Sequence, residues 1–203
     1  RYGEITAESV DGSVRLVYTV RQKADRYYQP SDIRTALMDL YASTGGEQWT
    51  RNDNWGSDLP LSEWYGLSVD NGVVTYVRLS NNNLTGELPR SIGVLSEVYG
   101  GVQLGDNNIS GRIPMGMFQH ENVYLSNNQI ESIESPDDPS DVRTVSLHLE
   151  GNRLSGALPE FFADAPVLQY VDLENNLFSG SIPASYTSLI AQDRRLYLNR
   201  NNL

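Results

Sequence analysis

The chain of 203 residues is acidic, with a formal net charge of −11 and a pI of about 4.5. A surface of this sign repels phosphate, which argues against nucleic acid as a partner. The chain has no cysteine, so disulfides, thiolate metal sites and a cysteine nucleophile are excluded. A hydrophobic content of 39% is typical of a folded protein, and no apolar run is long enough to span a membrane.

Two strand-like stretches lie within residues 1–30. They read GEITAESV (3–10) and SVRLVYTVRQ (13–22), and Asp11-Gly12 between them is a hairpin turn signal. This segment is expected to be a β-hairpin extension of the domain that follows, or the tail of an upstream β-domain. The sequence leaves both options open.

Residues 31–72 are predicted to begin with a helix. SDIRTALMDLYAST (31–44) opens on a Ser-Asp start signal, and its apolar residues fall at helical spacing until Gly45-Gly46. The rest of this region carries the three tryptophans of the chain, Trp49, Trp55 and Trp64. A tryptophan cluster can bind sugars, but we favour packing over the open end of a repeat core.

From residue 73 to the end the chain repeats one pattern. An asparagine recurs at intervals of 25, 21, 24, 24 and 25 residues, at Asn82, Asn107, Asn128, Asn152, Asn176 and Asn201. Around each lies the pattern L-x-x-L-x-L-x-x-N-x-L, which is the leucine-rich repeat signature. The predicted fold is a curved, right-handed α/β solenoid of about six repeats, the last incomplete, with a parallel β-sheet on its concave face.

The segment SNNNLTGELP (80–89) shows what each repeat does. Asn82 is expected to satisfy backbone groups of its own turn and of the neighbouring one, so that stacked copies form a ladder. Leu84 and Leu88 are expected to face the core. The Gly-x-x-Pro tail, Gly86 to Pro89, is expected to turn the chain towards the convex side.

The third repeat lacks this tail and reads ESIESPDDPSD at 131–141. Its prolines and acidic residues predict a protruding loop. A calcium site made by Asp137, Asp138 and Asp141 is the alternative. Because the EF-hand ligand spacing is missing, a solvated acidic loop is favoured, and no metal or cofactor is predicted.

The repeats with their G-x-[IL]-P tails resemble the plant-type leucine-rich repeats of extracellular receptors and inhibitors, which are also found in bacterial surface proteins. The stretch from ALMDLYASTGGEQW to SEWYG (36–66) is similar to the N-terminal cap of the bacterial members. Plant caps have two cysteines where this chain has Ser62 and Val69. The resemblance implies a recognition module that is secreted or on the cell surface.

Few residues suggest catalysis. The chain has two histidines, and His120 occupies an apolar position of the third repeat, whereas His148 is expected to point outward from a strand. Asp172 and Glu174 could be a glycosidase pair, but a solvated face is the simpler interpretation. No nucleophile elbow, zinc motif or phosphate loop is present, so the chain is predicted not to be an enzyme.

Binding is predicted on the concave face, where alternate residues of each strand point away from the core. Its aromatic, arginine and amide side chains are of types enriched at binding sites. The candidate residues are Tyr76, Arg78, Gln103, Asn122, Tyr124, His148, Tyr170, Asp172, Arg195 and Tyr197. The expected ligand is a protein, peptide or glycan. The alternative is a structural or adhesive array that self-associates through its ends, since the chain stops within the sixth repeat at Leu203.

Overall fold

The structure is a computed structural model, and it describes residues 2–8, 15–21, 30–97 and 101–203. The first two of these segments are strands, β1 (Tyr2–Glu8) and β2 (Arg15–Arg21), which pair in antiparallel register. The two predicted strands are therefore present and paired, and the predicted turn at Asp11-Gly12 lies outside the described residues. The assignment of residues 1–30 to an extension or to an upstream domain stays a prediction.

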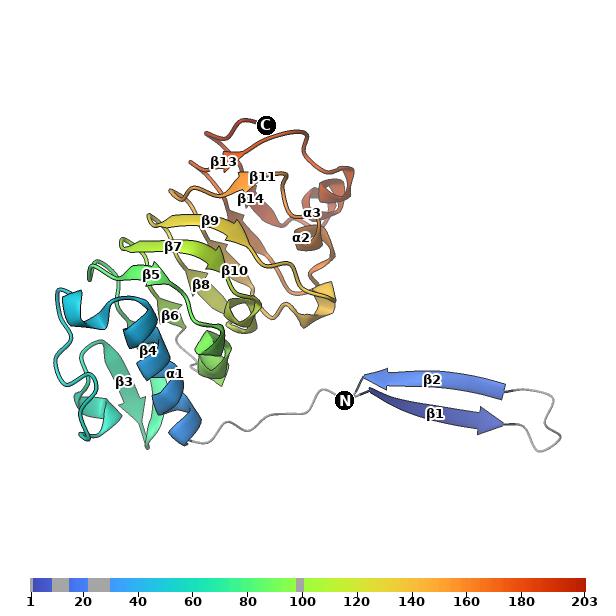
Figure 1. The fold of residues 1–203 in the computed structure, drawn as a ribbon. Helices are drawn as coiled ribbons and strands as arrows, with labels where there is room; N and C mark the ends of the chain where they lie inside the picture. The colour runs from blue at the N-terminus through green and yellow to red at the C-terminus, as the bar shows by residue number, and fades with distance from the viewer. Residues whose placement is uncertain (1, 9–14, 22–29, 98–100) are drawn as a thin grey trace.

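A seven-stranded sheet runs through the rest of the chain (Figure 1). Its strands, in spatial order, are β14 (Arg195–Tyr197), β12 (Tyr170–Asp172), β10 (Ser146–His148), β8 (Asn122–Tyr124), β6 (Val102–Gln103), β4 (Val73–Arg78) and β3 (Leu67–Asp70). Neighbouring strands are parallel, except that β3 is antiparallel to β4 at the N-terminal edge. Each repeat contributes one parallel strand, as predicted for the solenoid sheet. The surface of this sheet that faces away from the core is called the concave face below.

The sequence did not predict the strands that follow the first five of the six asparagines. They form two further parallel sheets: β5 (Thr85–Glu87), β7 (Asn108–Ile113) and β9 (Gln129–Ile133) in one, and β11 (Ser155–Gly156) and β13 (Leu177–Phe178) in the other. In Figure 1 these strands lie over the seven-stranded sheet. Three of the four Gly-x-x-Pro segments therefore begin in a paired strand, whereas Gly180 to Pro183 lies outside the strands.

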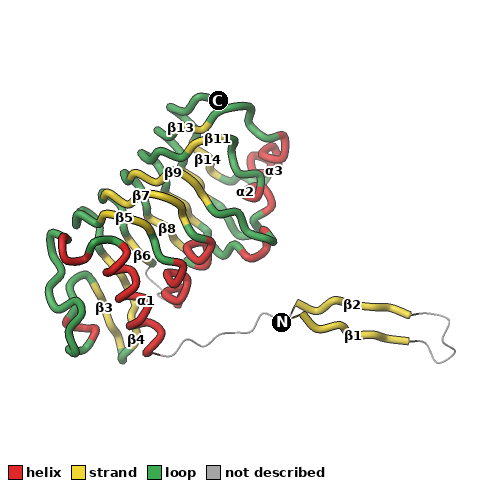
Figure 2. The backbone as a smooth tube through the Cα atoms, viewed as in Figure 1, coloured by secondary structure: helices red, strands yellow, loops and turns green. Residues whose placement is uncertain are grey.

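Helical segments complete each repeat and, within the repeats, lie along one side of the stack (Figure 2). The α-helices are α1 (Pro30–Ser43), α2 (Phe161–Asp164) and α3 (Thr187–Ala191). The 3-10 turns are η1 (Gly46–Gln48), η2 (Leu61–Glu63), η3 (Arg90–Glu97), η4 (Met115–Gln119), η5 (Pro139–Asp141) and η6 (Ala184–Tyr186). None of the helices in the described part is long and apolar enough to cross a bilayer.

The core is one continuous row of apolar side chains between the sheets and the helices. The inward strand residues Val77, Leu79, Val123 and Leu147 are completely buried, as the repeat pattern predicts. Where η3 meets η4 the backbones touch: a Cβ added to Gly93 would lie 2.9 Å from the Cα of Gly116. Only glycine allows this close approach.

The predicted asparagine ladder is confirmed, and it has a direction. Asn152 Nδ2 donates to Leu125 O of the preceding repeat (2.9 Å) and to Leu149 O of its own repeat (3.0 Å), while its Oδ1 accepts from the Ile130 N–H (3.0 Å). Asn107, Asn128, Asn176 and Asn201 repeat this geometry. Each amide therefore ties its own turn to the preceding repeat.

The first rung joins the repeats to the tryptophan-rich region. Asn82 accepts from the Arg51 N–H (2.8 Å) and donates to Arg51 O (2.9 Å). The cluster itself is buried: Trp49, Trp55 and Trp64 are 5%, 7% and 2% exposed. Their rings pack in series at 4.8 and 5.0 Å. Rings this deeply covered pack the end of the core and leave no face for a sugar.

The prediction of a protruding loop at 131–141 is wrong for its first part, because residues 131–133 belong to β9 and pair with β7. Glu134 follows directly. Its carboxylate accepts from the Met115 N–H at 2.9 Å and pairs with Arg90 at 2.7 Å. The backbone hydrogen bond, and then Arg90, lower the pKa of Glu134. The segment that replaces Gly-x-x-Pro thus supplies an acid that joins three successive repeats.

His120 is structural, as predicted. It is 1% exposed, and its Nε2 lies 3.1 Å from Ile92 O. Burial lowers its pKa from 6.5 to about 4, because desolvation penalises the charged imidazolium. His120 is therefore neutral in the folded protein at pH 7.

Asn152→Ala should lower the free energy of unfolding by about 1–3 kcal/mol, because it leaves the buried Ile130 N–H without its acceptor and removes one of the two asparagine donors to Leu125 O and to Leu149 O. Urea titration measures this change. The control is Arg153→Ala, at the adjacent exposed residue, which should change stability by less than about 0.5 kcal/mol. Equal effects of the two substitutions would contradict a special role for the ladder.

Acid should destabilise the fold through His120. The unfolded chain binds a proton here below pH 6.5, and the folded chain only below about 4, so stability is complete above pH 6.5 and falls between these values. The shift corresponds to about 3 kcal/mol. Urea titrations at several pH values should show this loss in the wild type and a flatter profile in His120→Leu. Parallel profiles would refute it.

Candidate functional site

Four aromatic rings form a ladder across the C-terminal half of the concave face. Tyr124 and His148 stack with centroids 4.9 Å apart and 19° between planes, and His148 and Tyr170 stack at 4.6 Å and 29°. Tyr170 and Tyr197 follow at 5.4 Å, tilted by 44°. Strands about 4.8 Å apart impose this spacing on rings that stand side by side.

The ladder does not follow one row of the sheet. Tyr124, His148, Asp172 and Tyr197 are successive cross-strand partners, so a strict row would contain an aspartate. Tyr170, two residues before Asp172, leans diagonally into that place and donates its hydroxyl to Asp172 Oδ2 at 3.2 Å. The other carboxylate oxygen of Asp172 accepts from the Glu174 N–H at 3.0 Å. Asp172 is therefore a positioning partner for the third ring.

The Tyr170 hydroxyl lies in a negative environment. Burial, followed by the charge of Asp172 and its hydrogen bond, raises the pKa of Tyr170 to about 12, and Glu150 adds to the effect. Glu150 was not among the predicted site residues. Its Oε2 is buried and has no hydrogen-bond partner within the described chain. Because it lies two residues after His148, strand alternation could have placed it on the same face as His148.

The predicted residues of the N-terminal half form a separate group. The Arg78 guanidinium lies over the Tyr76 ring at 3.8 Å and donates to the Ser68 hydroxyl at 2.8 Å. Gln103 is half-buried on β6, between Arg78 and Tyr124, and Asn122 is half-buried two residues before Tyr124 on β8. At the opposite end Arg195 is exposed on β14. The ten predicted residues thus share one face, but only four of them form the ring ladder.

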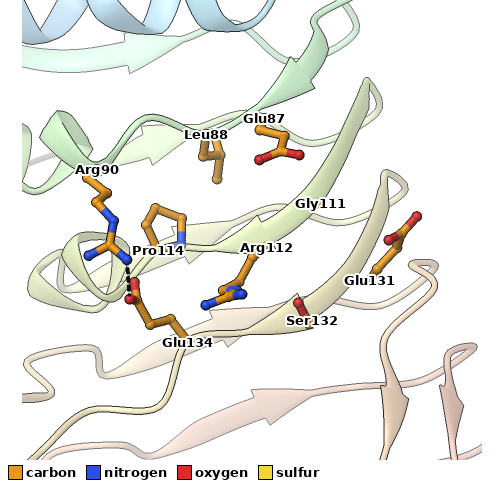
Figure 3. Close-up of a pocket in the computed structure, with 9 residues that line it drawn as sticks. All are labelled: Glu87, Leu88, Arg90, Gly111, Arg112, Pro114, Glu131, Ser132 and Glu134. Carbon is orange, nitrogen blue, oxygen red and sulfur yellow. Dashed lines mark hydrogen bonds and ion pairs between the residues drawn. The ribbon is translucent and has the colours of Figure 1, made fainter.

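A hollow, called the second hollow below because it is separate from the concave face, lies at the sheet of β5, β7 and β9 (Figure 3). Its volume is about 400 Å³, and it is lined by Glu87, Leu88, Arg90, Gly111, Arg112, Pro114, Glu131, Ser132 and Glu134. The sequence did not predict it, because it depends on the unpredicted pairing of β7 with β9. Its groups are mostly exposed, and Arg90 is held by Glu134.

The calcium alternative has no structural basis. Among the residues that the structure describes, no three acidic or histidine side chains lie close enough to hold a metal ion. Asp138 instead accepts from the Ser140 N–H at 2.9 Å and caps η5. The loop containing Asp137 and Asp141 is therefore a capped surface turn.

Comparison with known proteins agrees with this geometry. The Leucine Rich Repeat family profile matches residues 74–95, 143–165 and 167–189. The chain folds as a leucine-rich repeat solenoid. The ectodomain of BIR2 from Arabidopsis thaliana has the same fold, with 28% identity and a TM-score of 0.64 over 85% of this chain and 94% of that chain.

Two further similarities are to receptor kinases of Arabidopsis thaliana. The leucine-rich repeat ectodomain of SOBIR1 is 25% identical, with a TM-score of 0.59 over 85% of this chain and 94% of that chain. Pollen receptor-like kinase 2 is 30% identical over 143 residues, which are 64% of this chain and 21% of the relative. The chain thus spans about a fifth of the length of that curated relative.

These relatives are plant proteins, so they do not support the bacterial origin suggested by the cap motif. The resemblance of residues 36–66 to a bacterial cap stays a prediction. What the structure does show there is a buried tryptophan cluster, and Arg51 of the same region is hydrogen-bonded to Asn82, the first residue of the asparagine ladder.

Tyr170 should ionise late. In a stopped-flow pH jump, tyrosinate absorbance should include a component near pH 12 that disappears in Tyr170→Phe. Asp172→Asn should move this component to lower pH, because the substitution removes the negative charge and the charged acceptor. If Tyr170→Phe instead removes a component near pH 10, the ring lacks the environment described.

Proposed function

We propose that this chain is an extracellular or cell-surface recognition module that binds a protein, peptide or glycan ligand on its concave face. The observation that carries the proposal is the ladder from Tyr124 to Tyr197. It places hydroxyl, imidazole and carboxylate groups in a row on the outer surface of the sheet. These side chains point away from the core and are not needed to pack it.

Rigidity is what makes such a row suitable for binding. Each ring is held by its neighbours and by a strand whose inward residues, such as Val123, Leu147 and Val171, are buried. Side chains that are ordered before binding lose little entropy when a ligand arrives. Tyrosine is also among the residues enriched at binding hot spots.

The relatives support the extracellular setting. BIR2 and SOBIR1 are represented by ectodomains, and SOBIR1 and pollen receptor-like kinase 2 are receptor kinases by name. A leucine-rich repeat module of this size fits the ectodomain part of such a protein, since it covers 94% of both solved chains. Secretion or surface display of this chain is part of the proposal.

The proposal includes no catalysis. His120 is enclosed in the core, and Asp172 is engaged by Tyr170 and by the backbone of Glu174. His148 is stacked between two tyrosines rather than directed at a nucleophile. These placements favour binding over acid–base chemistry.

The test uses two probes, a phage library of random dodecapeptides and an array of plant and bacterial glycans. Binders from at least one should lose at least about tenfold in affinity for Tyr124→Ala/His148→Ala, because two adjacent rings of the ladder are removed. The melting temperature should change little, because both residues are only half-buried.

The control is Glu131→Ala/Ser132→Ala, two exposed residues of β9 on the other sheet, which should leave binding unchanged. If neither probe yields a binder, or if binders tolerate the ring substitutions, the concave-face assignment is wrong.

A further inference from the structure

The stacking of the ladder restricts what it can bind. Sugars that dock on aromatic residues use the flat face of a ring. Here Tyr124 and Tyr170 stack on His148 at 4.9 and 4.6 Å, one on either side of it along the sheet, so both of its faces are covered. Tyr170 is packed in turn between His148 and Tyr197. The inner rings of the ladder therefore present their edges to a ligand.

Ring edges carry the polar atoms of these side chains. Tyrosine hydroxyls donate and accept, and a neutral imidazole has one donor and one acceptor. His148 forms no hydrogen bond with any residue that the structure describes, so its ring nitrogens remain available. Such a row of edge groups suits a polypeptide backbone and polar side chains better than the apolar face of a sugar ring.

Two carboxylates add a negative charge beside the third ring. Asp172 bonds the Tyr170 hydroxyl, and Glu150 acts on the same hydroxyl electrostatically. Neither carboxylate forms an ion pair with a described residue. Glu150 also has a buried oxygen without a partner, which is an unfavourable arrangement that a ligand donor would relieve.

The two arginines nearby form no ion pair with Glu150 or Asp172. Arg200 lies 3.8 Å from Glu174, so these two compensate each other. Arg195 is exposed one strand further on, in register with Tyr170. Asp172 on β12 and Glu150, two residues after β10, thus carry negative charge beside the third ring without an ion-pair partner among the described residues.

We propose that the concave-face ligand is an extended peptide segment containing an arginine, rather than a glycan. The peptide lies along the ring edges, and its guanidinium donates to Glu150 and Asp172 beside the Tyr170 hydroxyl. Arginine fits this position because its planar fork has five donors and satisfies more than one carboxylate oxygen. This inference rests on the proposed function and specifies its ligand.

The test begins with dodecapeptides from the phage library that require Tyr124 and His148. These peptides should be enriched in arginine. Their affinity should fall about tenfold for Glu150→Gln/Asp172→Asn. The matched control, Glu87→Gln/Glu131→Gln, removes the same two charges from the rim of the second hollow and should change affinity less than about twofold.

A peptide in which citrulline replaces the arginine should bind the wild type about tenfold more weakly. It should show no further loss with Glu150→Gln/Asp172→Asn, because the interacting partners are then already removed.

The outcomes separate the two proposals. Ladder-dependent peptides without arginine enrichment, or equal losses in the variant and the control, would overturn this inference and leave the recognition function standing. Ladder-dependent binding of glycans alone would do the same. If no probe binds in a ladder-dependent manner, both proposals fall.

Discussion

The asparagine amide that crosses from one repeat to the previous one is the interaction on which the rest of this structure depends. Each amide gives a buried turn N–H its acceptor and donates to carbonyls at the ends of two successive strands, so that a carbonyl such as Leu125 O is shared between two neighbouring asparagines. Because it reaches backwards by one repeat, it sets the register between neighbouring strands as well as closing its own turn. The first amide extends the same bond to Arg51, so the tryptophan-rich region is held in the same register.

That register aligns the outward side chains of successive strands, so that they contact one another across the concave face. Strands held about 4.8 Å apart bring Tyr124 and His148 to stacking distance without further adjustment. At β12 the row contains Asp172, and the ladder continues only because Tyr170 crosses diagonally and bonds to it. The negatively charged Asp172 therefore also holds Tyr170 in the position that completes the row of rings.

The third repeat shows how the scaffold accepts a departure from its own pattern. It lacks Gly-x-x-Pro, yet β9 still pairs with β7, with a register shift after Gly111. Glu134 then takes over a connecting role, joining Arg90 and the Met115 backbone. Two of the charged groups that line the resulting hollow, Arg90 and Glu134, already pair with each other, whereas the outward polar atoms of the ring ladder are not used by the core. This difference is why the concave face is the better candidate for recognition.

The sequence by itself determined the repeat, the asparagine ladder, the buried positions and the ten residues of the concave face, because each follows from a fixed period and from the alternation of a strand. It also indicated that His120 is structural, since it occupies an apolar position. Only the tertiary structure decided that strands follow five of the asparagines, that residues 131–133 belong to one of these strands, and that Tyr170 rather than Asp172 continues the ring ladder. These features depend on pairing between repeats and on the direction in which a side chain leans, and neither is recorded in the period of a single repeat.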